Sequence, residues 1–331
     1  MDKVKLIKDK IHGNIEFNHL EGDIFATALY NRLHFILQNS MAFSVYPSNK
    51  TSRFEHSLGV MQIATDIYKH GISNASIDTA IHYLKDKQKL ITQIKEKVKN
   101  DLSKDCDVFD YEKHKNIDID IPLLQNIFGR PFINNNFLPF TIYKDNQNLI
   151  TSYYLLLEIV RLGALFHDVG HLPFSHLTEF AIDAFYNFIE KEKIDNTKLR
   201  ENLKQIKTPK HTTKQQLHEQ LGIKLSSAIF DYLIQYKYQK DCKKIFVLRI
   251  IQKLLEEFFK GKHGNLYSLY LIISSDLDAD RLDYVIRDMD ACGFKHSVDI
   301  DRITKLYILE KNKDNNYSDN FKFFPALQSI S

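Results

Sequence analysis

The sequence of 331 residues contains little glycine, proline and cysteine. Eleven Gly and seven Pro are few for a turn-rich all-β protein, so the composition favours helices. The three Cys (Cys106, Cys242 and Cys292) are far apart and form no CxxC pair, which argues against a disulfide framework and a zinc knuckle. Lys and Arg exceed Asp and Glu by only three, too small a surplus for a protein that coats a polyanion.

The sequence also lacks a recognisable targeting segment and a long apolar run. Its start, Met1-Asp-Lys-Val-Lys, has neither the charged nor the apolar region of a secretory signal. The most apolar stretch, residues 153–166, is interrupted by Glu158 and Arg161 and is shorter than the roughly 20 residues that span a bilayer. We therefore expect a soluble, cytoplasmic protein with no membrane segment.

Hydrophobic periodicity predicts an all-α fold with one small β-hairpin near the C-terminus. Only residues 306–310 and 321–324 alternate like strands, on either side of a polar turn. The segments with helical spacing are 14–40, 57–70, 153–167, 177–192, 216–236, 244–260 and 267–288.

Changes in composition along the chain predict its organisation. We expect the helical core to comprise residues 1–74 and 151–300. Residues 75–150, which are rich in Lys and interrupted by Gly and Pro, are predicted to be an inserted, mostly solvent-facing element of helix and loop. Residues 301–331 are predicted to begin a C-terminal extension that contains both helix and strand.

The strongest feature is a group of histidines at the end of an apolar helix. In the sequence from Leu165 to His176, three His and one Asp lie within ten positions. A single buried His is usually a hydrogen-bonded core residue. Burying this many ionisable groups without a partner is costly, so the run predicts a bound cation or an anionic ligand. These residues are His167, Asp168, His171 and His176.

The spacing His-Asp-x-x-His is similar to the His-Glu-x-x-His helix of zinc proteases. Here the shorter Asp168 replaces the general-base Glu. Gly170 and Pro173 also predict that the helix ends where a zinc-protease helix must continue. We therefore reject a zinc protease.

Two distant segments add to this pattern. Arg53-Phe-Glu-His-Ser-Leu-Gly59 places His56 at the start of a helix. A second segment, 275–290, holds six Asp among apolar residues, which fits poorly with a purely solvated stripe. On one continuous helix, the side chains that would share a face are Asp276, Asp280, Asp283 and Arg287.

In this order the motifs resemble the HD superfamily of metal-dependent phosphohydrolases, and more closely its dNTP triphosphohydrolases. An isolated His-Asp pair is common, whereas the ordered set of motifs is specific. The resemblance covers most of the chain apart from residues 75–150 and 190–214, and it implies an HD-domain helical core. It also includes Ile11-His-Gly-Asn-Ile-Glu16, Arg32-Leu33, His218-Glu-Gln and Asp280–Asp288.

The resemblance implies that His56, His167, Asp168 and Asp280 are metal ligands. Two imidazoles and two carboxylates suit Mn²⁺, Fe²⁺, Zn²⁺ or Mg²⁺. Such an ion polarises a phosphoryl oxygen and lowers the pKa of a bound water. The implied activity is hydrolysis of a (deoxy)nucleoside triphosphate to nucleoside and triphosphate.

The resemblance also implies roles for residues around the metal. His171, Glu179 and His218 match the group that handles protons, although animal members have Asp at the position of Glu179. Arg53 and Arg281 are the expected phosphate-binding cations. The remaining residues expected to bind substrate are Gln38, Asn39, His176, Tyr284 and Asp288, of which Tyr284 is explained equally well by core packing.

The sequence departs from the family at three places. Asn39 stands where members have a Leu that excludes the ribose 2′-hydroxyl, so the preference between ribose and deoxyribose stays open. Ala26 and His34 replace the Asp and Arg of the activator pocket, so activation by GTP is not implied. The family segment that contacts the base follows the hairpin, beyond Ser331.

Two other functions remain open. The first is an HD nucleotidase or phosphodiesterase that acts on other phosphorylated nucleotides; Glu179, His218 and the face from Arg281 to Asp288 favour the triphosphate. The second is a nucleic-acid-binding or nucleotide-sensing protein, supported only by the basic segment 198–214, which a solvated loop explains as well. By resemblance to animal members, we also expect a homo-oligomer.

Replacing Asp168 by Ala is expected to abolish metal binding and turnover without unfolding the protein, because the substitution removes one carboxylate from the donor set. Metal titration and circular dichroism of the variant check both parts. Full activity in Asp168→Ala would contradict the metal assignment.

Overall fold

The structure is a computed structural model that describes residues 5–102, 117–130, 146–191, 198–199, 201, 217–295, 298–312 and 317–326. Its helices are α1 (His19–Phe25), α2 (Ala28–Asn31), α3 (Arg53–Asn74), α4 (Ile77–Leu102), α6 (Ile121–Phe128), α7 (Gln147–Phe166), α8 (His176–Lys191), α10 (Leu217–Tyr232), α11 (Cys242–Phe258), α12 (Tyr267–Tyr270), α13 (Ala279–Ala291) and α14 (Ile300–Lys305). Its strands are β1 (Lys5–Asp9), β2 (Gly13–Phe17), β3 (Tyr307–Lys311) and β4 (Phe321–Pro325). The predicted all-α core with a small C-terminal hairpin, β3–β4, is confirmed.

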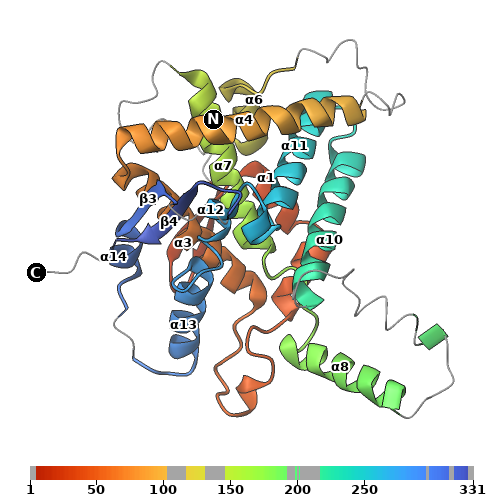
Figure 1. Ribbon diagram of the computed structural model, residues 1–331. Coiled ribbons are helices and arrows are strands. Elements are labelled where there is room, and N and C mark those ends of the chain that lie inside the picture. Colours follow the sequence, from red (N-terminus) through yellow and green to blue (C-terminus); the bar gives the residue numbers. More distant parts are fainter. Residues whose placement is uncertain are drawn as a thin grey trace, which may run out of the picture.

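Helix α7 forms the centre of the molecule (Figure 1). It packs against α3, α4 and α11, and every residue from Leu149 to Phe166 is buried. The helix extends N-terminally to Gln147, so the expectation that this apolar stretch is too short for a bilayer is wrong: its length and composition would allow it to span one. A helix that is apolar on all sides and surrounded by other helices is a core helix.

Helix α3 begins at a capping box and extends further than predicted. Ser52 caps its start: the Ser52 side chain accepts from the Glu55 backbone N–H, and the Glu55 carboxylate accepts from that of Ser52. The predicted helix over residues 57–70 does not stop before Gly71, because α3 continues to Asn74. Gly71 instead allows close packing, because a Cβ there would lie 2.4 Å from the ring of Phe323.

The predicted helix over residues 267–288 is broken in the structure into α12 and α13. Asp278 caps the start of α13 and accepts 2.7 Å hydrogen bonds from the backbone N–H groups of Arg281 and Ser275. An Asp that bonds the backbone in this way starts a new helix. As a result, Asp276 precedes α13 and does not share its buried face.

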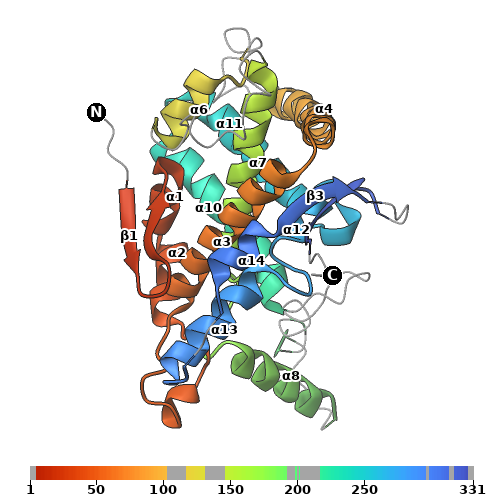
Figure 2. The same cartoon turned by 90° about the vertical axis from the view of Figure 1, so that its left-hand side faces the viewer.

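The predicted helix over residues 14–40 is wrong at its start, where β2 pairs with β1 in a second antiparallel hairpin. Asp9 closes the turn by accepting 2.8 Å hydrogen bonds from the backbone N–H groups of Ile11 and His12. Gly13 completes the turn with a φ of 74°. Figure 2 shows β1 lying along the side of the molecule next to α1 and α2.

Helix α4 lies in the predicted insertion, yet one of its faces belongs to the same core as α3 and α7. Its buried Lys87 donates to Asp319 Oδ1 at 2.7 Å and to the carbonyl of Asn265 at 2.8 Å. Asp319 Oδ2 in turn accepts from the backbone N–H and hydroxyl of Ser268. This buried ion pair connects α4 to α12 and to the segment that precedes β4.

Other expectations stay open. The division of the chain into domains remains a prediction. Residues 103–116 and 131–145 of the predicted insertion, and most of the basic segment 198–214, lie outside the described residues.

The variant Lys87→Met is expected to lower the free energy of unfolding by about 3–5 kcal/mol, because it leaves the Asp319 carboxylate buried without its cation. Chemical denaturation measures this loss. The control Lys89→Met changes an exposed lysine of the same helix and should leave stability nearly unchanged. Equal effects of the two variants would show that the ion pair does not stabilise the fold.

Candidate metal centre

The four predicted metal ligands come from three helices: His56, His167 and Asp168 place ligand atoms within 4.8 Å of one another, and Asp280 contacts both imidazoles. His56 lies in the first turn of α3, His167 and Asp168 follow the end of α7, and Asp280 lies in the first turn of α13. His56 Nε2 is 2.9 Å from Asp280 Oδ1 and 3.6 Å from Asp168 Oδ2. His167 Nε2 is 3.5 Å from Asp168 Oδ2 and 3.7 Å from Asp280 Oδ1. Ligands bound to one ion at about 2.1 Å are themselves about 3.0–3.4 Å apart, so the spacing of His56, His167 and Asp168 suits one divalent cation, and Asp280 adjoins that position through its contacts with both imidazoles.

Both imidazoles direct an unpaired nitrogen at this point. Among the described residues, Nε2 of His56 and Nε2 of His167 are buried and have no hydrogen-bond partner. The 2.9 Å contact between His56 and Asp280 lacks the alignment that an N–H hydrogen bond requires. Buried nitrogens that face carboxylates without bonding them fit a cation bound between them. The residues present therefore suit the divalent metal that the resemblance implies.

The other ring nitrogens fix the orientation of these ligands. His56 Nδ1 lies 2.8 Å from Asp283 Oδ2, and His167 Nδ1 lies 2.6 Å from the carbonyl of Ala164. An ionised carboxylate and a carbonyl only accept, so each Nδ1 carries a proton and Nε2 is the nitrogen left to bind a metal once it is deprotonated. Second-sphere contacts of this kind are typical of metal-binding histidines.

Opposite charges keep the ligands ionised. Burial would raise the pKa of Asp168, but His167 holds it well below its usual range. Burial would likewise raise the pKa of Asp280, which His167 and His56 lower. Burial would lower the pKa of His56, but the Asp280 and Asp283 carboxylates raise it to about 10. The two ligand carboxylates thus carry negative charge for a divalent cation, which binds with loss of a proton from His56.

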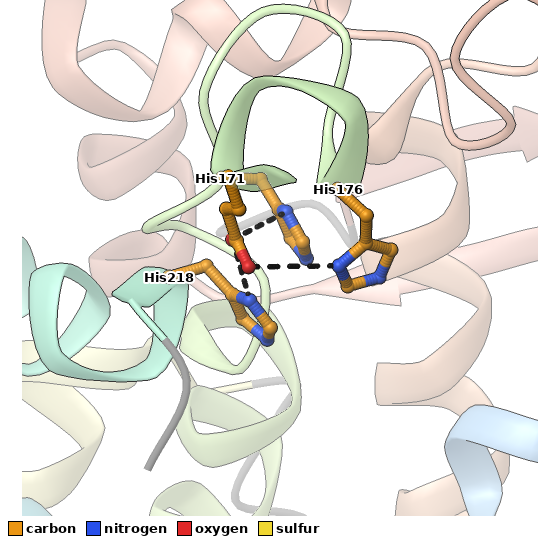
Figure 3. A group of neighbouring side chains, drawn as sticks. His171, His176 and His218 are labelled. Carbon is orange, nitrogen blue, oxygen red and sulfur yellow. Dashed lines mark hydrogen bonds and ion pairs between the residues drawn. The ribbon is translucent and has the colours of Figure 1, made fainter. Parts of the chain in front are cut away.

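A second cluster, here called the Glu179 cluster, lies beside the four ligands and consists of His171, His176, Glu179 and His218 (Figure 3). His218 Nδ1 is 2.8 Å from Glu179 Oε1. His171 Nδ1 and His176 Nδ1 are 3.8 and 3.7 Å from the Glu179 carboxylate oxygens. The structure therefore brings together the residues predicted to handle protons, from the loop after α7 and from the starts of α8 and α10.

The Glu179 cluster contacts the metal ligands through His171, whose Nε2 is 3.3 Å from Asp168 Oδ1. Burial lowers the pKa of His171 to about 4 despite the opposing effect of Asp168, so its imidazole is neutral near pH 7. The rings of His171 and His218 stack at 3.9 Å and 15°. Parallel rings cannot both direct in-plane lone pairs at one ion, so this geometry favours proton exchange over a second metal. The catalytic assignment itself stays a prediction.

A strained turn positions the start of α8, which carries His176 and Glu179 of the Glu179 cluster. Phe174 and Ser175 adopt left-handed φ values of 63° and 50°, which non-glycine residues rarely do. The Ser175 hydroxyl holds the turn by accepting from Arg53 Nε and donating to the carbonyl of Leu37, both at 2.9 Å. Strain at a turn that positions polar side chains is common at functional sites. Beyond this first turn, α8 reaches away from the helical body (Figure 1).

The predicted substrate-binding residues lie around the ligands but differ in exposure. Arg53 is buried and donates to Asp168 and to the backbone carbonyl of Gln38. Asn39 donates to Asp288 Oδ1 at 2.6 Å, so these two form a pair. His176 and Arg281 are exposed, Tyr284 is half-buried, and Arg281 donates to the carbonyl of Asp276.

A cavity of about 140 Å³ opens beside the metal ligands. Its polar side is formed by His167, Asp168, Asp280 and His218, and Phe166, Phe258 and Tyr270 are among the residues of its apolar side. A cavity of this volume holds about one six-membered ring. It gives a small molecule access to the ligands.

The sequence alone missed the residues behind His56. Asp283 and Arg287 are buried, and Asp283 contacts both His56 and His12. The sequence showed the helical spacing of Asp283 and Arg287 from Asp280, and it showed His12 within a family motif. It did not show that Asp283 contacts His12 and His56.

The comparisons with known proteins agree with the motifs. No family model matches the chain. Deoxynucleoside triphosphate triphosphohydrolase SAMHD1 of Bos taurus is 44% identical over 63 residues, which are 19% of this chain and 11% of that protein. The chain resembles HD phosphohydrolases. The predicted resemblance is thereby confirmed over a short segment of a much longer relative.

Two proteins that match over most of this chain are less identical to it in sequence. Uncharacterized protein MJ1154 of Methanocaldococcus jannaschii is 22% identical over 303 residues, covering 91% of this chain and 37% of the archaeal protein. The crystal structure of a phosphohydrolase from Bacteroides thetaiotaomicron has a TM-score of 0.48 at 18% identity. The structural match covers 98% of this chain and 49% of the Bacteroides chain.

Gly170 lies in the loop after α7, at the point where this loop touches α10. The variant Gly170→Ala is expected to push His218 away from Glu179. A Cβ there would lie 1.8 Å from the His218 carbonyl and 2.5 Å from the Gly222 nitrogen, both of which are backbone atoms. The expected loss of stability is about 1–3 kcal/mol, measured by chemical denaturation.

The matched control is Gly222→Ala on the opposite side of the same contact. A Cβ at Gly222 meets no atom closer than 3.5 Å and suits a helix, so this variant should be as stable as the wild type or more so. Equal stability of both variants would contradict the close contact at Gly170.

Proposed function

We propose that the chain is a divalent-metal-dependent phosphohydrolase that converts nucleoside triphosphates to nucleoside and triphosphate. The observation that carries the proposal is the convergence of two unpaired imidazole nitrogens and two ionised carboxylates directly beside the Glu179 cluster. The local similarity to SAMHD1, a deoxynucleoside triphosphate triphosphohydrolase by its name, supports the triphosphate as substrate.

His56, His167, Asp168 and Asp280 would hold the metal. A bound divalent ion supplies Lewis acidity toward a phosphoryl oxygen and makes a neighbouring water more acidic. Around it, Arg53 neutralises part of the charge of Asp168 and keeps that carboxylate in place. The same guanidinium lies close enough to the ligands to face an incoming phosphate.

The Glu179 cluster would move the proton. His171 adjoins Asp168 through Nε2, and its Nδ1 is left without a hydrogen bond, so Nδ1 is the atom at which it would accept a proton. Glu179 lies between His171 and His218 and can pass or stabilise that charge. A histidine–carboxylate group next to a phosphate is what general acid–base catalysis requires.

The sugar would lie along α13, with Tyr284 and Asp288 one and two turns beyond Asp280. Near the C-terminal end of α13, the hydrogen-bonded pair of Asn39 and Asp288 presents an amide and a carboxylate to the sugar. Both groups can bond a hydroxyl, so we propose that a ribose is accepted as well as a deoxyribose. Assembly into a homo-oligomer is part of this proposal, by analogy with the family.

One observation favours the alternative of an HD nucleotidase or phosphodiesterase. Of the two predicted phosphate-binding cations, Arg53 already donates to Asp168 and Ser175, and Arg281 is bound to a backbone carbonyl. Three phosphates carry more negative charge than this pair balances. A substrate with one phosphate would need fewer cations.

Analysis of the products separates the two functions. Wild type and Asp168→Ala are incubated with each NTP, dNTP and nucleoside monophosphate in the presence of Mn²⁺, and the products are separated by ion exchange. We expect nucleoside and intact inorganic triphosphate from ribo- and deoxyribonucleotides with the wild type, and neither product with the variant.

Release of inorganic phosphate from monophosphates alone would replace the proposal with the nucleotidase. Turnover that persists in Asp168→Ala would contradict metal-dependent hydrolysis at this site.

A further inference from the structure

A buried network lies behind the metal ligand His56 and centres on Asp283 in α13. The Asp283 side chain is completely buried and has four close donors. His56 Nδ1 approaches Oδ2 at 2.8 Å and His12 Nε2 approaches Oδ1 at 2.6 Å. Arg287 donates from Nε to Oδ2 at 2.8 Å and from Nη2 to Oδ1 at 2.9 Å. Four donors fill the acceptor capacity of one carboxylate, so Asp283 has no freedom to turn.

The network continues to the surface hairpin. Arg287 Nη1 donates to Asp9 Oδ2 at 2.9 Å, and Asp9 Oδ1 holds the backbone of the β1–β2 turn that carries His12. Asp9 thus supports Arg287 and His12 but does not touch His56. The chain also leaves room for the carboxylate: a Cβ on Gly59, one turn after His56, would lie 1.8 Å from Asp283 Oδ1.

We propose that Asp283 is a positioning residue that fixes the proton of His56 on Nδ1 and holds Nε2 toward the metal. The network of His12, Arg287 and Asp9 keeps Asp283 in place for this purpose. The inference rests on the metal centre of the proposed function. It goes further by assigning a role to four residues outside the four ligands and the Glu179 cluster.

The orientation follows from the donors. The Asp283 carboxylate accepts only, so His56 must donate from Nδ1 and keep the lone pair on Nε2. Flipping the ring would break the 2.8 Å bond and direct a carbon at the carboxylate. The negative charge also makes the imidazole a stronger ligand, as carboxylates behind metal-binding histidines do.

The test compares Asp283→Asn with Asp290→Asn, which removes a carboxylate from the same helix, where Asp290 pairs with Lys10 outside the network. The Kd of Mn²⁺ is measured by chelator competition, the absorption spectrum of bound Co²⁺ is recorded, and circular dichroism checks folding. We expect Asp283→Asn to raise the Kd about 10- to 100-fold and to change the Co²⁺ spectrum, because its amide holds the His56 ring without a charge. Asp290→Asn is expected to keep the wild-type Kd and spectrum.

The contradicting outcomes are distinct. A folded Asp283→Asn with the wild-type Kd, or an equal loss in Asp290→Asn, would overturn the positioning role. Failure of the wild type itself to bind Mn²⁺ or Co²⁺ would instead overturn the metal centre of the proposed function.

A second measurement needs no variant and applies even where Asp283→Asn does not fold. In ¹⁵N-histidine-labelled wild type loaded with Zn²⁺, NMR of the imidazoles reports which nitrogen of His56 carries the proton. We expect the proton on Nδ1 and the metal on Nε2. The opposite arrangement would overturn the proposal.

Discussion

Helix α3 packs against α13 around the buried imidazole of His56, which lies next to the carboxylates of Asp280 and Asp283. Buried charges are tolerated only when each is paired, and here every pairing constrains a backbone element. Asp283 binds α13 to α3 and, through His12, to the N-terminal hairpin. The position of Asp280 relative to the histidine at the end of α7 follows from these contacts. The fold and the metal centre are therefore held by the same interactions.

The remaining helices bring short segments to this point from distant parts of the chain. Helix α7 is rigid because it is buried on all sides, and its last turn delivers His167 and Asp168. The strained turn that follows delivers His176 and Glu179 at the start of α8, while the close approach at Gly170 holds the start of α10 beside them. Ligands on rigid helices and proton-handling groups on adjoining turns form one continuous site.

The sequence predicted the four residues of the proposed metal centre through compact motifs that resemble a known family, and the structure brings their side chains close together. It also predicted most helices, since apolar periodicity reflects burial on one side. It could not predict the β1–β2 hairpin, which depends on a turn closed by the Asp9 side chain. The break between α12 and α13 was missed because a single capping residue, Asp278, decides it. The partnership of Asp283 with His12 joins residues 271 positions apart and is visible only in three dimensions.

We propose that His56, His167, Asp168 and Asp280 bind one divalent ion. Anomalous X-ray diffraction from crystals grown with Mn²⁺ tests it most directly. We expect one anomalous peak about 2.1 Å from Nε2 of both histidines, with Asp168 and Asp280 completing the ligand set. A peak within the Glu179 cluster instead, or no peak near His56 at saturating Mn²⁺, would contradict it.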